Sequence, residues 1–415
     1  MTVPGDKSIS HRALMLGGIA EGPSNISGFL AGDDCLATAA AMLAMGVSMT
    51  HSSATDITVH GVGLRGLIEP TGPLDLGNSG TAMRLFAGLL SGQEFPTTLT
   101  GDESLSIRPM KRVITPLAQM GAAIGSNGGC PPLQVQGGRE LRGIDYTLPV
   151  ASAQVKSAIL LAGLYADGIT TVKEPATTRD HTERMLQTMG VSIARDEHRI
   201  SLRGAQRLSA TEIKVPADLS SASFVMLAAI LSKDAEILIE NVGVNPTRTG
   251  VLDILLSMGA DITLENNRLY GQEPVADIRA RASGLRGIKV DPHLVSLAID
   301  EFPILFVAAA RAAGKTEFSG IGELRVKESD RIASMAAGLH HLGIRVEESP
   351  DGATVYCGSF RGGEVDSHGD HRVAMSLAIA ASIAASPVTV NNVAAVDTSF
   401  PGFTGTMSKL GVDIR

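Results

Sequence analysis

The feature that most constrains the fold is a pattern that occurs six times, at intervals of about 70 residues. In each occurrence an apolar-periodic segment ends in Met-Gly or Leu-Gly, and a β-like segment follows. The glycines are Gly46, Gly121, Gly190, Gly259, Gly343 and Gly411. Glycine is favoured just past the end of a helix because it adopts the left-handed conformation at little cost. The pattern therefore predicts six α/β units, each with one helix that ends at such a glycine.

Each unit also has a second expected helix. The predicted starts lie near Ser8, Ser79, Ser152, Ser220, Asp300 and Asp370. Units of this length are too long for solenoid repeats, whose periods run roughly 20–50 residues. Residues 215–222 contain a proline followed by possible helix caps, and three units lie on each side of them. We therefore expect two similar lobes with a cleft between them, which is a common place for a ligand.

Composition narrows the class of function. The chain has 415 residues, a net charge of −8 and three widely spaced cysteines. The negative charge argues against a general nucleic-acid surface, so an anionic ligand would need a local basic cluster. The cysteines fit a reduced cytoplasm and offer neither a disulfide framework nor a CxxC metal pair. No apolar run is long enough for a membrane span or a signal peptide. We expect a cytoplasmic protein with no membrane or nucleic-acid partner.

The first candidate site is PGDKSISHR at residues 4–12. Ser8 is the expected helix start, and Lys7 and Arg12 lie at the same end of that helix. Cations at a helix N-terminus oppose the helix dipole unless an anion is bound there. A capped and solvated helix start explains the motif about equally well.

A second candidate is LGNSGTAMR at residues 76–84. Gly80 would allow a ligand to approach the backbone closely, and Asn78 would cap the helix. Taken alone, an ordinary Asn-capped helix is the favoured interpretation. By contrast, GVGLRG at residues 61–66 matches a dinucleotide-binding motif, but the chain then runs into Pro70 and no helix follows. We therefore reject a dinucleotide site there.

Three further segments carry polar candidates. Arg108 precedes a proline, which holds it in an extended or turn conformation suited to a ligand clamp. Ser152 and Gln154 open an apolar helix and offer neutral donors and acceptors for hydroxyl groups. A capping box explains Asp180 and Glu183 in TRDHTE without a ligand, which leaves Arg179 as the candidate in that segment.

The strongest local pattern is ELRVKESDRI at residues 323–332. Lys327 and Arg331 are four residues apart, so they would share one face of a helix, with Glu328 beside them in its first turn. The two cations could bind an anionic substrate while the acid between them donates a proton to it. A charged surface helix is a common alternative. Arg372 is expected at another helix start. His368, Asp370 and His371 lie beside it and could be considered as metal ligands, but a helix cap at Asp370 is the favoured interpretation.

Together PGDKSISHR, LGNSGTAMR, SIRP, ASAQVKSA, TRDHTE, ELRVKESDR and GDHRVAMS resemble the 5-enolpyruvylshikimate-3-phosphate synthase family, in order and spacing along essentially the whole chain. The form of ASAQVKSA and of IDEFPIL resembles its bacterial class II branch. The resemblance implies a two-lobed inside-out α/β barrel of six βαβαββ units, three per lobe. One lobe would be residues 7–217, and the other, discontinuous lobe would be residues 1–6 and 218–415.

The resemblance also implies roles for residues at matching positions. Those that would bind shikimate 3-phosphate are Lys7, Ser8, Arg12, Ser152, Ala153, Gln154 and Arg179. Those that would hold phosphoenolpyruvate are Lys7, Gly80, Arg108, Gln154, Arg331 and Arg372, with Asn78 in the same motif and Lys327 contacting both substrates. Asp300 and Glu328 would be the acid–base pair, with Glu328 as the acid towards C3 and Asp300 as the base towards the 5-hydroxyl.

The implied enzyme is a transferase that moves the enolpyruvyl group of phosphoenolpyruvate to the 5-hydroxyl of shikimate 3-phosphate, in the shikimate pathway of aromatic amino-acid biosynthesis. It would act as a monomer by addition and elimination, without metal or organic cofactor. The related transferase that acts on UDP-N-acetylglucosamine is disfavoured, because residues 103–109 lack the loop cysteine it needs. A non-catalytic anion-binding protein would have no use for the two acids.

Two departures from the family pattern matter. Many members carry a lysine shortly before the last Phe-Pro, where this chain has Thr398. Glyphosate-tolerant class II members often have alanine where Gly80 stands, and the alanine methyl group crowds glyphosate. With glycine at this position, we expect a site that still admits glyphosate.

Overall fold

The computed structural model describes residues 1–414, which divide into two compact units. The N-terminal unit contains residues 5–215 together with residues 269–273. The C-terminal unit contains residues 1–4, residues 216–268 and the chain from residue 274 onward. The chain therefore passes between the units near residues 4 and 215. It crosses again just before residue 269 and once more just after residue 273. The sequence analysis did not anticipate the second pair of crossings.

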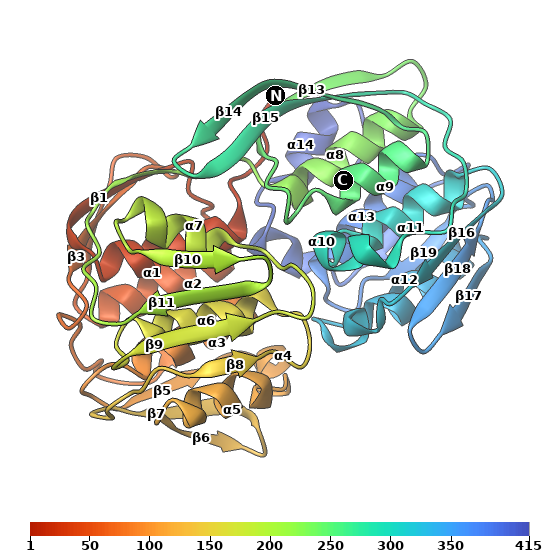
Figure 1. Ribbon diagram of the computed structural model, residues 1–415. Helices are drawn as coiled ribbons and strands as arrows, with labels where there is room; N and C mark the ends of the chain where they lie inside the picture. The colour runs from red at the N-terminus through yellow and green to blue at the C-terminus, as the bar shows by residue number, and fades with distance from the viewer. Residues whose placement is uncertain (415) are drawn as a thin grey trace. The chain divides into compact units, whose positions relative to one another are not determined.

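The N-terminal unit is an assembly of three sheets and seven helices among the described residues (Figure 1). Its helices are α1 (Lys7–Gly18), α2 (Asp33–Ala44), α3 (Gly80–Leu90), α4 (Glu103–Ser106), α5 (Lys111–Gln119), α6 (Ala153–Gly163) and α7 (His181–Thr188). Its strands are β1 (Glu21–Ser27), β2 (Ser48–His51), β3 (Ile57–Val62), β4 (Leu74–Asp75), β5 (Thr97–Thr100), β6 (Ala123–Asn127), β7 (Cys130–Gln136), β8 (Asp145–Thr147), β9 (Ile169–Lys173), β10 (Ile193–Asp196), β11 (Arg199–Arg203) and β12 (Glu212–Lys214).

Each of these sheets has four strands, in the orders β12-β1-β3-β2, β4-β5-β7-β6 and β10-β11-β9-β8. In every one, a parallel pair is extended by an antiparallel hairpin: β12 with β1, β4 with β5, and β8 with β9 are the parallel pairs. The first sheet takes its parallel partner from the far end of the unit, because Asn25 on β1 pairs with Glu212 on β12. Strand β12 therefore closes the set of three repeats.

The C-terminal unit repeats the arrangement with smaller sheets. Its helices are α8 (Leu219–Leu231), α9 (Gly250–Ser257), α10 (Val295–Ala298), α11 (Phe302–Arg311), α12 (Arg331–His341), α13 (His371–Ala381) and α14 (Phe403–Lys409), with short 3-10 helices η1 (Pro292–Leu294), η2 (Gly322–Val326) and η3 (Val393–Thr398). Its strands are β13 (Glu236–Gly243), β14 (Asp261–Tyr270), β15 (Glu273–Arg281), β16 (Lys315–Ser319), β17 (Val346–Ser349), β18 (Gly352–Tyr356), β19 (Gly363–Asp366) and β20 (Val388–Asn391). They form the sheets β13-β15-β14, β16-β18-β17 and β19-β20.

Each unit contains helices that are buried on nearly all sides. Helix α8 is buried along almost its entire length, and α3, α6 and α11 are nearly as enclosed. A helix that is apolar on all sides needs neighbours on all sides, so these helices form the interior of their units and the sheets lie outside them. In Figure 1 the sheet β10-β11-β9-β8 lies over α6 in this way.

The six predicted units are confirmed, but in the part of the chain that the structure describes their strands do not close into a barrel. Across the described residues the strands form six separate open sheets. All six predicted glycines follow the ends of α2, α5, α7, α9, α12 and α14, each with a positive φ. An L-residue would be strained there, which explains why the pattern located these helix ends so well.

Within residues 1–414, no helix is long and apolar enough to cross a membrane.

Candidate functional site

In the N-terminal unit, the first turns of α1, α3 and α6 lie together. His11 on α1 contacts Ser79, the N-cap of α3, with 3.4 Å between Nε2 and Oγ. Gln154 in the first turn of α6 donates to Thr81 on α3 at 2.9 Å and accepts from Arg84 at 2.8 Å. Three helix N-termini therefore lie side by side, and the positive ends of their dipoles favour an anion.

Helix α1 is capped two residues earlier than the sequence analysis expected. Asp6 is the N-cap and accepts from the backbone N–H of Ile9 at 2.8 Å, so Ser8 lies inside the helix and the predicted start at Ser8 was wrong. Asp6 outcompetes Ser8 because a buried carboxylate is a good cap and also suits the positive end of the dipole. Lys7, next to it, forms an ion pair with Asp34 on α2 at 2.8 Å.

Arg12 is buried and lies one turn beyond Ser8. Its guanidinium donates to the carbonyl of Ser8 at 2.8 Å, to the Thr182 hydroxyl at 2.7 Å and to the Ser157 hydroxyl at 2.7 Å. Burial lowers the pKa of Arg12 to about 10, opposed by the charges of nearby acids, of which Glu183 acts most strongly. The group is still a cation at neutral pH.

A second cluster surrounds Arg108, which follows the short helix α4. Its Nη2 donates to the Asn78 side chain at 2.5 Å and to the Ser104 hydroxyl at 3.1 Å. Asn78 in turn donates to Asp102 at 2.7 Å. The expected cap at Asn78 was therefore wrong: Ser79 caps α3 by accepting from Ala82 N–H at 3.1 Å, and Asn78 holds Arg108 instead.

The remaining candidates in this unit lie at two helix starts. Ser152 caps α6 and accepts from the N–H of Val155 at 3.3 Å, and Ala153 is the first helical residue. Arg179 lies half-buried in the segment before α7.

The predicted capping box of Asp180 and Glu183 was wrong. Asp180 is the N-cap residue of α7, but its side chain makes no capping hydrogen bond. Its carboxylate instead pairs with Arg184 at 2.7 Å and Arg195 at 2.6 Å. Glu183 is buried against Lys156, with 2.7 Å between carboxylate and ammonium.

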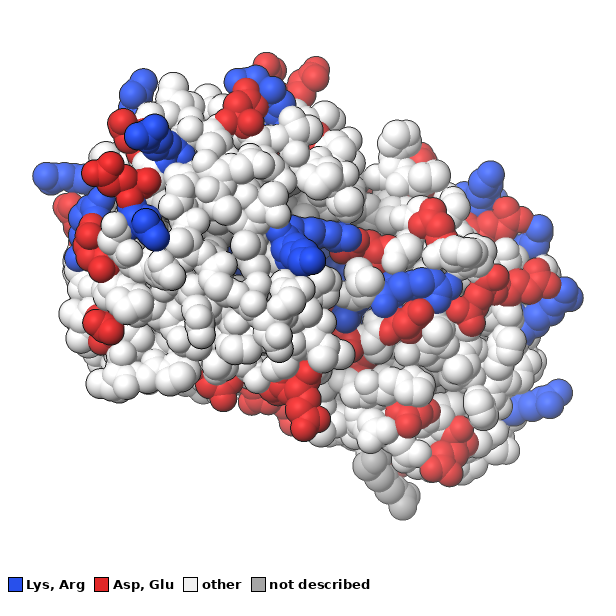
Figure 2. Space-filling view, turned by 90° about the horizontal axis from the view of Figure 1, so that it is seen from below, with Lys and Arg blue, Asp and Glu red and all other residues white. Residues whose placement is uncertain are grey.

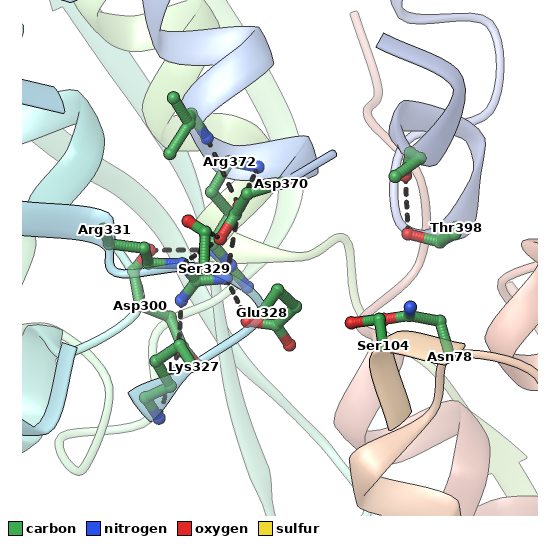
Figure 3. Close-up of polar contacts among 12 residues, drawn as sticks. Asn78, Ser104, Asp300, Lys327, Glu328, Ser329, Arg331, Asp370, Arg372 and Thr398 are labelled. Atoms are coloured by element: carbon green, nitrogen blue, oxygen red, sulfur yellow. Dashed lines mark hydrogen bonds and ion pairs between the residues drawn. The ribbon is translucent and has the colours of Figure 1, made fainter. Parts of the chain in front are cut away.

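In the C-terminal unit, Arg331 is the centre of a cluster of acids (Figure 3). Its guanidinium lies 2.7 Å from Asp370, 2.5 Å from Glu328 and 3.4 Å from Asp300. Burial alone would lower the pKa of Arg331, but the charges of Asp370, Glu328 and Asp300 outweigh burial and raise it. Both predicted acid–base residues therefore contact the same permanent cation.

Lys327 and Glu328 do not lie on a helix, so the prediction that Lys327 and Arg331 share a helix face was wrong. Asp330 caps α12 by accepting from Ala333 N–H at 3.0 Å, and the helix begins at Arg331. Lys327 and Glu328 lie in the loop before it, with Lys327 Nζ 3.8 Å from Asp300. From this loop both side chains lie close to Arg331, and the two cations Lys327 and Arg331 do not share a helix face, where like charges would repel.

Arg372 is in the first turn of α13, as predicted, and Asp370 is the N-cap. Asp370 accepts from the backbone N–H of Arg372 at 2.8 Å while its carboxylate also pairs with Arg331. The Arg372 guanidinium donates to the carbonyl of Asp300 at 3.0 Å and lies 3.7 Å from Glu301. Among residues 1–414, no group of three acids, histidines or cysteines is arranged to hold a metal ion.

Sequence reasoning missed several residues that shape these clusters. Arg84 and Thr182 lie within motifs that were noticed, but nothing in their spacing showed that they contact Gln154 and Arg12. Lys156, within ASAQVKSA, was assigned no role. A charged residue in the middle of an otherwise apolar run was the one available signal.

On the face drawn in Figure 2, blue and red side chains occur in small mixed groups and most of the surface is white. This face does not carry the continuous basic stripe that nucleic acids require.

The comparisons with known proteins agree on one family. Residues 1–407 match the family model of EPSP synthase (3-phosphoshikimate 1-carboxyvinyltransferase). A 3-phosphoshikimate 1-carboxyvinyltransferase of Methylococcus capsulatus is 57% identical over 414 residues, covering 100% of this chain and 95% of the relative. One from Alkalilimnicola ehrlichii is 58% identical over 414 residues, covering 99% and 93%.

Solved structures point the same way. The EPSP synthase of Acinetobacter baumannii has a TM-score of 0.89 and 50% identity, covering 99% of this chain and 95% of that one. The enolpyruvyl transferase NikO of Streptomyces tendae has a TM-score of 0.81 at 18% identity, covering 100% and 95%, and so shares the fold. The chain belongs to the EPSP synthase family.

Proposed function

We propose that this chain transfers the enolpyruvyl group of phosphoenolpyruvate to the 5-hydroxyl of shikimate 3-phosphate and releases phosphate. Its family membership supports the reaction. The structural observation that carries the assignment of residues is the contact of Arg331 with both Asp300 and Glu328. An anion-binding protein would gain nothing from two carboxylates held against its central cation, whereas a proton-transfer enzyme needs them beside the bound anion.

We assign shikimate 3-phosphate to the N-terminal unit. The adjacent N-termini of α1 and α6 supply backbone N–H groups, and Lys7, Arg12 and Arg179 supply positive charge. Ser8, Ser152, Ala153 and Gln154 lie in the first turns or at the caps of the same helices. Hydroxyl and amide groups at these positions suit the ring hydroxyls of the substrate.

We assign phosphoenolpyruvate to two groups of residues. The first is Gly80, Arg108 and Asn78, where Asn78 orients the guanidinium of Arg108. The second is Lys327, Arg331 and Arg372, all beside Asp300. Thr398 replaces the lysine of many relatives, and its hydroxyl donates to the carbonyl of Ala395 at 2.7 Å (Figure 3). This position therefore contributes no charge to substrate binding.

The chemistry then runs in two balanced steps. The 5-hydroxyl oxygen attacks C2 of phosphoenolpyruvate as Asp300 takes the hydroxyl proton and Glu328 delivers a proton to C3, which gives a tetrahedral intermediate. In the second step C3 loses a proton to Glu328, the C2–C3 double bond re-forms, and phosphate leaves from C2 and takes up the proton that Asp300 had accepted. The guanidinium groups stabilise the negative charge on the departing phosphate. We further propose a monomeric cytoplasmic enzyme, with residues 7–217 and residues 1–6 plus 218–415 as its two substrate-carrying lobes.

The test is release of phosphate from phosphoenolpyruvate with shikimate 3-phosphate or UDP-N-acetylglucosamine as acceptor. We expect release with shikimate 3-phosphate alone. Glu328→Gln should lower kcat by about 10²–10⁴-fold and leave shikimate 3-phosphate binding nearly unchanged, because it removes a proton donor and keeps the side-chain shape. The matched control is Glu317→Gln on β16, where the acid also pairs with a cation, Lys315, at 2.5 Å. Equal activity of both variants would refute the role of Glu328.

We also propose that glyphosate enters the phosphoenolpyruvate site. A Cβ atom added at Gly80 would lie 2.8 Å from Nη1 of Arg84 and 3.2 Å from Nη1 of Arg108. Gly80→Ala should therefore displace guanidinium groups as well as occupy space, and overpacking of this kind costs about 1–3 kcal/mol. We expect the variant to need roughly tenfold more glyphosate for half-inhibition, with a smaller rise in KM for phosphoenolpyruvate. Wild-type activity that resists glyphosate as strongly as the variant would contradict this proposal.

A further inference from the structure

Arg12 differs from Arg331 and Lys156, two other buried cations, in the chemistry of its partners. Arg331 contacts three carboxylates, and Lys156, one helix away from Arg12, lies 2.7 Å from Glu183 and 3.0 Å from Glu174. Within the described part of the chain, Arg12 has only neutral hydrogen-bond partners and no carboxylate within ion-pair distance. A buried cation without a paired acid is costly, so such an arrangement is expected where an anionic ligand completes it.

Two hydroxyl groups make this arrangement possible. Thr182 on α7 accepts from Arg12 Nε, and Ser157 on α6 accepts from Nη2. The two hydroxyls also hydrogen-bond to each other at 2.7 Å, so they form a closed triangle with the guanidinium. All three side chains are buried, and the triangle fixes the plane of the guanidinium from two sides.

Lys156 removes the acid that would otherwise neutralise Arg12. Glu183 is buried, and its charge acts on Arg12 more strongly than that of any other acid. Its carboxylate is nevertheless paired with Lys156, whose ammonium also reaches Glu174 and the carbonyl of Thr178 at 3.5 Å. The charge of Glu183 therefore stabilises the Arg12 cation without a direct contact, and the N–H donors of Arg12 remain available to other groups. An arginine has five N–H donors, and three of Arg12's are used within the described residues.

We propose that Thr182 and Ser157 are positioning residues, which orient the Arg12 guanidinium through neutral acceptors so that its charge and remaining N–H groups are available to an anionic group of shikimate 3-phosphate. Lys156 supports them by holding Glu183 away from Arg12. This inference rests on the proposed function, because that function assigns shikimate 3-phosphate to Arg12. It adds three residues to the site, none of which needs to touch the substrate.

The experiment compares Thr182→Val with Thr182→Ser in the full-length enzyme. Valine keeps the shape and removes the acceptor, whereas serine keeps the acceptor. A hydrogen bond to a charged group corresponds to about tenfold in affinity, so Thr182→Val should raise KM and the calorimetric Kd for shikimate 3-phosphate by about tenfold. We expect kcat and KM for phosphoenolpyruvate to change less than about twofold, and Thr182→Ser to restore the wild-type KM within about threefold.

The matched control is Thr170→Val, in the same repeat on β9. Thr170 is also fully buried, and its hydroxyl has no hydrogen-bond partner within residues 1–414. This variant should leave both KM values unchanged. If Thr182→Val fails to fold, Ser157→Ala takes its place with the same expected selective rise in KM for shikimate 3-phosphate.

The outcomes separate the two proposals. Wild-type enzyme that neither binds shikimate 3-phosphate nor releases phosphate would refute the proposed function, and this inference with it. An active wild type whose Thr182→Val and Ser157→Ala variants keep the wild-type KM would overturn the inference alone. A lower Tm without a change in KM would show that the triangle only stabilises the fold, and it would count equally against the proposal.

Discussion

His11 is a buried histidine that the structure holds in its neutral form. Its Nδ1 lies 2.8 Å from the hydroxyl of Thr38, and its Nε2 lies 3.4 Å from the hydroxyl of Ser79. Burial lowers the pKa of His11 to about 3, and the charges of Lys7 and Arg12 lower it further in the same direction. A protonated ring would add a third cation to a site that already holds two.

This shift predicts a pH dependence of stability. Above pH 6.5 His11 is neutral in both folded and unfolded chains and has no effect; below it, only the unfolded chain takes up the proton, so stability falls until the pH reaches about 3. The expected loss at pH 5 is about 2 kcal/mol. His11→Asn should reduce the difference in unfolding free energy between pH 7 and pH 5 by this amount, measured by urea denaturation. His51→Asn, at an exposed position, should leave that difference unchanged.

At the scale of elements, Asp370 joins two helix N-termini. Its carboxylate accepts from the backbone N–H groups of Arg372 and Val373 and from the guanidinium of Arg331, the first residue of α12. The side chain is fully buried. One acid therefore caps α13, compensates the charge of Arg331 and fixes α12 against α13, which is more than the cap that the sequence pattern predicted.

Asp370→Asn should therefore destabilise the protein far more than the loss of a cap. Removing one partner of a buried ion pair typically costs about 3–5 kcal/mol, because the remaining charge stays buried. The comparison is Asp330→Asn at the cap of α12, whose side chain is 38% exposed. That variant should cost only about 1 kcal/mol. Equal losses in urea denaturation would mean that Arg331 does not depend on Asp370.

The ends of helices could be predicted from the sequence more reliably than their starts. A C-terminal glycine is required by backbone conformation alone, so the Met-Gly and Leu-Gly pairs located six helix ends correctly. A cap depends on which of several polar neighbours is not engaged elsewhere. Asn78 and Asp180 were expected to cap helices, but both accept from guanidinium groups instead. Arg184 lies one turn from Asp180, whereas Arg108 lies 30 residues from Asn78, and no local pattern reveals the latter contact.

At the scale of the whole molecule, the repeat predicted six units, but it could not predict how they are completed. Strand β12 returns to pair with β1 because the first repeat lacks a parallel strand of its own. Residues 269–273, at the turn between β14 and β15, belong to the N-terminal unit, where Glu273 contacts His181 at 2.8 Å. Both features join segments far apart in sequence, and neither contains a motif that marks its partner.

The two units have separate hydrophobic cores, which predicts that shikimate 3-phosphate can stabilise the N-terminal unit more than the C-terminal unit. A ligand that binds only the folded state adds about 2.7 kcal/mol at a concentration one hundred times its Kd. In hydrogen exchange with shikimate 3-phosphate alone, we expect slower exchange in the first turns of α1, α6 and α7. Helices α8 and α9, in the core of the C-terminal unit and without a residue in the proposed site, should exchange at the rate of the free enzyme.

The same measurement on Thr182→Val links this expectation to single residues. At one fixed concentration of shikimate 3-phosphate, the variant should lose most of the protection in α1 and α6, because its affinity is lower. Raising the ligand concentration about tenfold should restore it. Protection that appears equally in both units of the wild type would contradict the assignment of shikimate 3-phosphate to the N-terminal unit. Protection that the variant retains in full at the lower concentration would show that Arg12 does not need Thr182 to bind the substrate.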